Sequence, residues 1–106
     1  MIRQVILFNL EEKVDPDEHM KWLLRSHIPQ ATRGPGVRKM VLSVAMEHEG
    51  QPKYRYMAEV YYDNLAALEH AKLTPEYQKL SEDYHGRSSE IFPRKDLTRI
   101  VFKQIV

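Results

Sequence analysis

The stretch T-P-E-Y-Q-K-L-S-E-D-Y-H-G-R, Thr74–Arg87, carries the start and stop signals of a helix. Thr74 is a favoured N-cap, and Pro75 suits the first helical position, where its missing N–H costs nothing. Gly86 can adopt the left-handed conformation that ends a helix. Helical spacing places these side chains on one face, with His85 at its edge: Tyr77, Leu80, Ser81 and Tyr84. A face that only filled a core would carry more Leu, Ile and Ala, so this one predicts a pocket with polar groups pointing into it.

The rest of the chain predicts a sheet for this helix to cover. Strands are expected at Ile2–Leu10, Val37–Met46, Tyr54–Tyr62 and Leu97–Val106, and further helices from Asp15 to about Ile28 and at Leu65–Lys72. The order β-α-β-β-α-β predicts an α+β fold, the ferredoxin-like sandwich, with four antiparallel strands and both helices on one face. Residues 1–106 form one domain by this interpretation. Because the strands are apolar on both faces, the bare faces are expected to meet in a homodimer.

The first helix has the clearest local signals. Asp15 is expected to be its N-cap, with a capping box closed by Glu18, and the helix should stop before Pro29. Its inward stripe is predicted to be Met20, Leu23, Leu24, His27 and Ile28. Trp22 falls on the opposite face of an ideal helix, where a lone large aromatic suggests a contact with another chain.

Composition excludes several classes of function. The 106 residues carry a net charge of +1, so nothing favours nucleic acid or an anionic membrane as a partner. The absence of cysteine removes disulfides and thiolate chemistry and fits a cytoplasmic location. The short apolar N-terminal run is read as a strand rather than a signal peptide or a membrane span. No metal-binding or nucleotide-binding motif occurs, so neither a metal nor a cofactor is predicted.

Short motifs resemble a known superfamily. The opening strand, the sequence His27-Ile28-Pro29, the passage M-A-E-V-Y-Y-D-N-L-A-A-L at Met57–Leu68, and T-P-E-Y at Thr74–Tyr77 resemble the dimeric α/β-barrel superfamily. The middle two resemble its EthD-like branch. The S-E-D-Y at Ser81–Tyr84 is similar to the REDY-like small proteins of prodigiosin-type pigment clusters, differing from an R-E-D-Y signature at Ser81.

The resemblance implies a cavity between sheet and helices that takes small aromatic or polyketide-like ligands, often without a cofactor. REDY-like proteins are accessory proteins of bipyrrole assembly. Other relatives are cyclases, isomerases or monooxygenases that use a His and a Tyr as acid and base. Two functions are therefore carried forward: a ligand-binding accessory protein of secondary metabolism, such as prodigiosin-like pigment biosynthesis, and a cofactor-free enzyme. The ligand expected is small, aromatic and mainly apolar.

Candidate site residues follow from the two predicted helices and the sheet. The candidates for acid–base chemistry are His27, Tyr84 and His85, and those for ligand binding are Tyr56, Tyr77 and Ser81. Each has a simpler interpretation. His27 can be a core histidine satisfied by one hydrogen bond, and the tyrosines can pack their rings while their hydroxyls reach water.

For two residues, Tyr56 and Arg33, the sequence allows two different roles. Tyr56 shares a predicted strand face with Tyr54 and Tyr62, and this face can be a ligand wall or the seam of a dimer. Arg33, in the loop after the first helix, can pair with a ligand carboxylate or be a solvated surface arginine.

Overall fold

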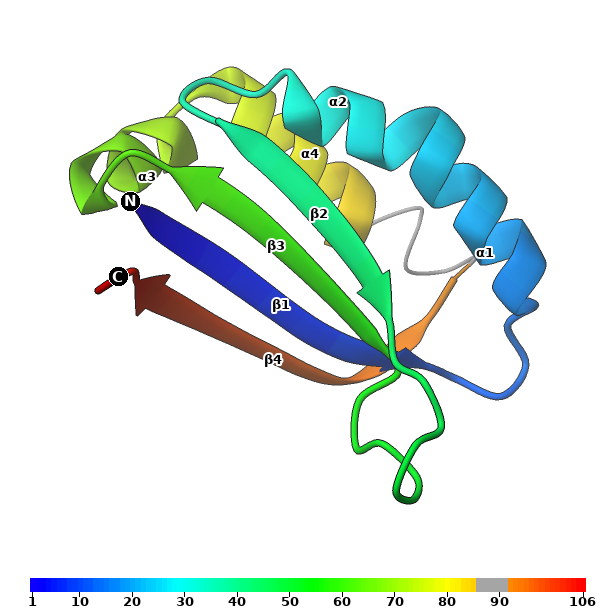
Figure 1. Ribbon diagram of the computed structural model, residues 1–106. Helices are drawn as coiled ribbons and strands as arrows, with labels where there is room; N and C mark the ends of the chain where they lie inside the picture. The colour runs from blue at the N-terminus through cyan, green and yellow to red at the C-terminus, as the bar shows by residue number, and fades with distance from the viewer. Residues whose placement is uncertain (86–91) are drawn as a thin grey trace.

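The fold is a four-stranded antiparallel sheet with helices packed on it (Figure 1). The computed structural model describes residues 1–85 and 92–106, and side chains are described for 1–82 and 92–106. The strands are β1 (Ile2–Leu10), β2 (Lys39–Val44), β3 (Tyr56–Tyr62) and β4 (Arg94–Lys103), in the sheet order β2-β3-β1-β4. The helices are α1 (Pro16–Trp22), α2 (Ile28–Thr32), α3 (Leu65–Lys72) and α4 (Pro75–His85). This topology confirms the predicted ferredoxin-like α+β fold.

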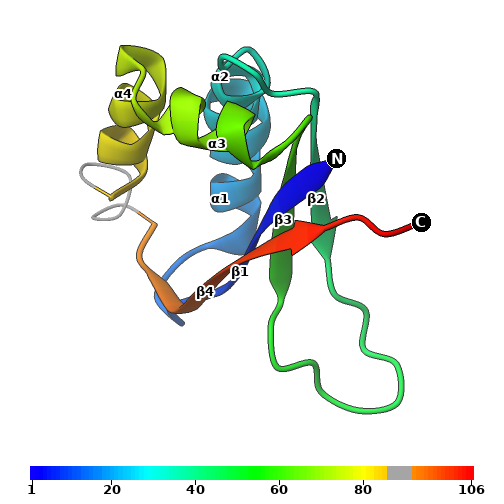
Figure 2. The same cartoon turned by 90° about the vertical axis from the view of Figure 1, so that its left-hand side faces the viewer.

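All the described helices lie on one side of the sheet, as the edge-on view in Figure 2 shows. Their contact with the sheet buries a cluster formed by Ile2, Val60, Tyr62, Leu68 and Ala71. In β1 and β3 the residues of this face are paired across the strands, with Ile2 opposite Tyr62 and Gln4 opposite Val60. The even-numbered positions of β1 therefore face the helices, and the odd-numbered positions face away.

The first helix is longer than the sequence predicts, because it does not stop at Pro29. Asp15 caps it as expected, accepting a hydrogen bond from the N–H of Asp17 at 2.9 Å, whereas Glu18 pairs with Lys21 instead of closing a capping box. A π-helical turn at Leu23–His27 joins α1 to α2, and the N–H of Ile28 bonds to the carbonyl of Leu23, five residues back. Pro29 then occupies the first turn of α2, where its missing N–H is tolerated.

The π turn changes which residues of this helix face inward. In an ideal α-helix Trp22 and His27 are separated by about 140° around the axis. Here their rings stack, with centroids 5.2 Å apart, so the predicted outward position of Trp22 is wrong. Leu24, predicted to face inward, is 58% exposed, while His19 is completely buried. The buried line of the helix is His19, Leu23, His27 and Ala31, one residue in every four.

Side-chain caps explain where α3 and α4 begin. The Asn64 side chain accepts a hydrogen bond from the N–H of Ala67 at 2.8 Å. The Thr74 hydroxyl accepts one from the N–H of Tyr77 at 3.3 Å, as its sequence position predicts. The predicted end of α4 at Gly86 lies outside the described residues. The last strand, β4, begins at Arg94, three residues before the predicted Leu97.

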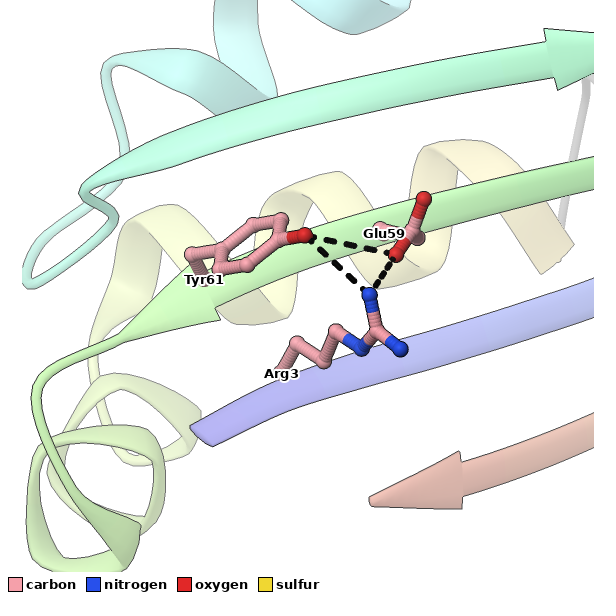
Figure 3. A network of polar contacts seen from close by, with 3 residues as sticks. All are labelled: Arg3, Glu59 and Tyr61. Carbon is pink, nitrogen blue, oxygen red and sulfur yellow. Dashed lines mark hydrogen bonds and ion pairs between the residues drawn. The ribbon is translucent and has the colours of Figure 1, made fainter. Parts of the chain in front are cut away.

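The opposite face of the sheet carries no described helix and presents a mixed polar and apolar surface. Arg3 of β1 donates to the Glu59 carboxylate and to the Tyr61 hydroxyl, both on β3 (Figure 3). Phe102 lies under the Arg3 guanidinium, 5.7 Å from its ring centroid, and is 44% exposed. Tyr56 and Tyr62 are buried on the other, helix-covered face, so of the two interpretations of their face the dimer seam does not apply to them. Tyr54 does not share that face: its hydroxyl meets the hydroxyl of Thr98, which is paired with Leu7, at 2.8 Å.

Candidate functional site

A cavity of about 110 Å³ lies between the helix-covered face of the sheet and the helices. Its floor is made by side chains of β1 and β3, including Ile6, Ala58 and Val60. Its walls come from the first helix and α4. Most of the lining is apolar, and the polar lining includes Gln4, His27, Tyr77, Ser81, Arg94 and Arg99. An apolar cavity with a few convergent polar groups is the usual form of a small-molecule site.

His27, the last residue of the π turn, lines this cavity. Its side chain is 7% exposed and stacks on Trp22 with an interplanar angle of 26°. Burial is the main cause that lowers the pKa of His27 to about 4, with smaller contributions in the same direction from the positive charge of Arg94 and from His19. At neutral pH the imidazole is therefore uncharged, with one nitrogen able to donate and the other able to accept a hydrogen bond.

His19, one helical turn before Leu23, is a buried histidine that the sequence did not single out, and it is not part of the cavity lining. It is 0% exposed and is surrounded by rings, with centroid distances of 6.0 Å to Phe8, 5.6 Å to Tyr56 and 5.5 Å to Phe92. Within the described part of the chain, neither of its ring nitrogens has a hydrogen-bond partner. Burial lowers its pKa to about 4, helped by the charge of Arg94. The predicted inward stripe omitted His19 because that stripe began one residue later, at Met20.

The polar face of α4 lies against the cavity as far as its side chains are described. Tyr77 and Ser81 both line the cavity. The side chains of Tyr84 and His85 lie outside the described residues. Tyr56 stacks on Phe8, with ring centroids 5.2 Å apart and ring planes inclined by 15°. It is buried and is not among the residues that line the cavity. The cavity thus brings together His27, Tyr77 and Ser81.

The positive charge at the cavity comes from β4, not from the loop that holds Arg33. Arg33 follows α2, is exposed and does not line the cavity. Arg94 and Arg99 do line it, and the Arg94 guanidinium lies over the Phe8 ring, 5.7 Å from its centroid. The sequence did not single out either arginine, because a spacing of five residues would place them on opposite faces of a regular strand, and their common place at the cavity depends on the irregular register between β1 and β4.

The EthD domain family matches residues 11–86 of the chain. The chain belongs to the EthD domain family. A solved EthD family protein from Bacillus halodurans has a TM-score of 0.76 and 23% identity, over 99% of this chain and 100% of that one. No curated protein matches the chain.

Two more distant solved structures share the fold of this EthD-domain chain. A dimeric ferredoxin-like protein from Bacteroides fragilis has a TM-score of 0.63 and 14% identity, over 97% of this chain and 95% of that one. SnoaB, a cofactor-independent oxygenase from Streptomyces nogalater, has a TM-score of 0.67 and 14% identity, over 99% and 93% of the two chains. At these identities the likeness concerns the fold alone.

Other kinds of site are not seen in the described part of this EthD-domain chain. Across residues 1–82 and 92–106, no three histidine or carboxylate side chains gather closely enough to hold a metal ion. None of the described helices has the length and hydropathy that crossing a bilayer requires.

Proposed function

We propose that this chain is an accessory protein of secondary metabolism that binds a small, flat, aromatic ligand in the cavity between its sheet and its helices. The observation that carries the proposal is the cavity itself, about 110 Å³ and mainly apolar, with His27, Tyr77 and Ser81 at its surface. An apolar cavity of about 150 Å³ accepts a benzene molecule, so a cavity of about 110 Å³ suits a ligand of about one small ring. Membership of the EthD family fits such a role.

A finer version of the proposal assigns the ligand to a prodigiosin-like bipyrrole pathway. It rests on the resemblance of S-E-D-Y at Ser81–Tyr84 to REDY-like proteins. Ser81, the first residue of that motif, lines the cavity. The absence of cysteine fits a reducing cytoplasm as the compartment.

The second candidate function is a cofactor-free cyclase, isomerase or monooxygenase, with His27 and either Tyr84 or His85 as the acid–base pair. The observation in its favour is that His27 is neutral, buried and at the cavity surface. SnoaB, which shares the fold, is a cofactor-independent oxygenase. Against it, a general base works best when its pKa is near the working pH, and the pKa of His27 is about 4. Ligand binding is therefore the leading proposal.

A homodimer that covers the open face of the sheet is part of the proposal. Ile100 and Phe102 of β4 lie on that face and are 40% and 44% exposed. The ferredoxin-like relative from Bacteroides fragilis is dimeric. Light scattering should give twice the monomer mass, and Phe102→Asp should return the protein to the monomer. If the wild-type protein has the mass of one chain, the dimer proposal is wrong, and the proposal of ligand binding in the cavity is unaffected.

Calorimetric titration with pyrrole-2-carboxaldehyde, a flat heteroaromatic probe, tests ligand binding. Saturable binding is expected, and Leu80→Phe, which fills the cavity from α4, should weaken it at least 10-fold. Leu73→Phe is the matched control, because Leu73 is exposed and does not line the cavity. If the wild type does not bind, or if Leu80→Phe binds as well as the wild type, the proposal is wrong. Turnover of the bound probe that disappears in His27→Gln with binding retained would favour the enzyme.

A further inference from the structure

We infer that the ligand of this cavity carries a neutral amide group, and that Gln4 and Tyr62 on the floor of the cavity bind it. The inference rests on the proposed function, because it names the class of molecule that the proposed cavity accepts. That class is a one-ring aromatic carboxamide or lactam. It adds one polar group to a ligand that the sequence predicts to be mainly apolar.

Gln4 places a buried amide at the cavity. It lies on β1, is 8% exposed and is part of the lining. Its neighbours across the sheet, Val60 of β3 and Val101 of β4, are apolar. Among the residues that the structure describes, none forms a hydrogen bond with the Gln4 side chain. A buried amide without a partner is unfavourable, so a ligand that bonds to it would gain from both its donor and its acceptor.

Tyr62 places a phenol hydroxyl at the same part of the floor. It lies on β3, two residues beyond Val60, and is 2% exposed. Because Val60 is opposite Gln4 and alternate residues of a strand share a face, Tyr62 is a diagonal neighbour of Gln4. Its hydroxyl also makes no hydrogen bond with the described residues. Burial raises the pKa of Tyr62 to about 12, with Tyr77 as a smaller cause, so the hydroxyl keeps its proton and can donate.

A neutral amide matches this pair of side chains. Its carbonyl oxygen can accept a hydrogen bond from the Tyr62 hydroxyl, and its N–H can donate to the carbonyl oxygen of the Gln4 side chain. A ketone or an ester would pair with the hydroxyl but would leave the Gln4 carbonyl oxygen without a donor. An amide is therefore the group that satisfies both side chains at once.

The neighbouring part of the floor suits a single aromatic ring. Ile6 is two residues beyond Gln4 on β1, and it is opposite Ala58 of β3. Both line the cavity with apolar side chains, and the volume of about 110 Å³ suits about one small ring. A ring over Ile6 and Ala58, with its amide toward Gln4 and Tyr62, uses both parts of the floor.

Furan-2-carboxamide and 2-acetylfuran form a matched pair of probes, since a methyl group in the ketone replaces the amino group of the amide. Calorimetric titration at pH 7 should show that Gln4→Met lowers the affinity of the amide relative to the ketone at least about 5-fold, because only the amide donates to Gln4. Tyr62→Phe should weaken both probes at least about 3-fold, because both carbonyl groups accept its hydrogen bond. Gln78→Met and Tyr54→Phe are the matched controls, since neither residue lines the cavity, and they should bind both probes as the wild type does.

Urea unfolding of the same variants without ligand is an independent measurement. Because neither polar group bonds to a described residue, Gln4→Met and Tyr62→Phe should be at least as stable as the wild type. A loss of probe binding in these variants is then not a loss of folding. A lower urea midpoint in either variant would show that its polar group is already satisfied within the protein, and would overturn the inference.

The remaining outcomes separate the two proposals. If pyrrole-2-carboxaldehyde binds but neither furan probe does, the amide inference is wrong and the ligand-binding proposal stands. The same holds if Gln4→Met leaves the ratio of the two affinities unchanged, or if Tyr62→Phe binds both probes as tightly as the wild type. If none of the three compounds binds, both proposals fail.

Discussion

Replacing His19 with leucine is expected to make the protein less sensitive to acid. His19 is completely buried, and its pKa is about 4 in the folded protein, against about 6.5 for an exposed histidine. The unfolded chain therefore takes up a proton at a higher pH than the folded protein does. The stability that the neutral imidazole allows is fully present above about pH 6.5 and is lost as the pH falls toward 4.

The size of the effect follows from the two pKa values. At pH 5 the unfolded chain is almost fully protonated at this position and the folded protein is mostly neutral, which costs about 2 kcal/mol of the free energy of unfolding. A domain of this size has a total of about 5–15 kcal/mol, so the loss is easily measured. At pH 7 the leucine variant should be at least as stable as the wild type, because it removes two buried nitrogens that have no hydrogen-bond partner among the described residues.

Urea unfolding followed by far-UV circular dichroism at pH 7 and pH 5, at one fixed protein concentration, measures the effect. Between these two pH values the wild type should lose about 2 kcal/mol more than His19→Leu. His70→Gln, at an exposed position of α3, is the control and should lose as much as the wild type. If His19→Leu loses the same free energy as the wild type, the buried imidazole does not set the acid sensitivity and the reasoning is refuted.

Two further predictions concern the packing of α3. Leu68→Ala should lower the free energy of unfolding by about 2–5 kcal/mol, because Leu68 is 0% exposed in the core cluster, whereas Leu65→Ala at the exposed start of the same helix should change it by less than about 0.5 kcal/mol; equal losses in urea unfolding would contradict the assigned packing. Asn64→Ala should cost about 1 kcal/mol in the same assay, since it removes the cap on the N–H of Ala67, and a neutral result would show that water replaces the cap.

The fold could be predicted from the sequence because its signals are local and agree with one another. Asp15, Asn64 and Thr74 are caps that satisfy backbone N–H groups within the next three residues, and the structure uses all three. The fold class followed from the alternation of elements along the chain. What could not be predicted was the π turn at Leu23–His27, because no residue type requires it and the periodicity test assumes 3.6 residues per turn.

That turn accounts for most of the errors in the site. A buried residue at every fourth position moves an ideal helix about 40° past a full turn at each step, so a stripe chosen at ideal spacing included Leu24 and omitted His19. His27, Tyr77 and Ser81 were found because they lie on the cavity side under either spacing. Arg94 was missed for a different reason: the charge at a cavity depends on tertiary placement, which local patterns do not encode.

His27 bears on both functions proposed for the cavity. Its low pKa has burial as the larger cause and the charge of Arg94 as the next. A general base works best when its pKa is near the working pH, so at neutral pH this imidazole is suited to donate or accept a hydrogen bond with a ligand rather than to take up its proton. Binding is therefore the property to establish first, and turnover is the second.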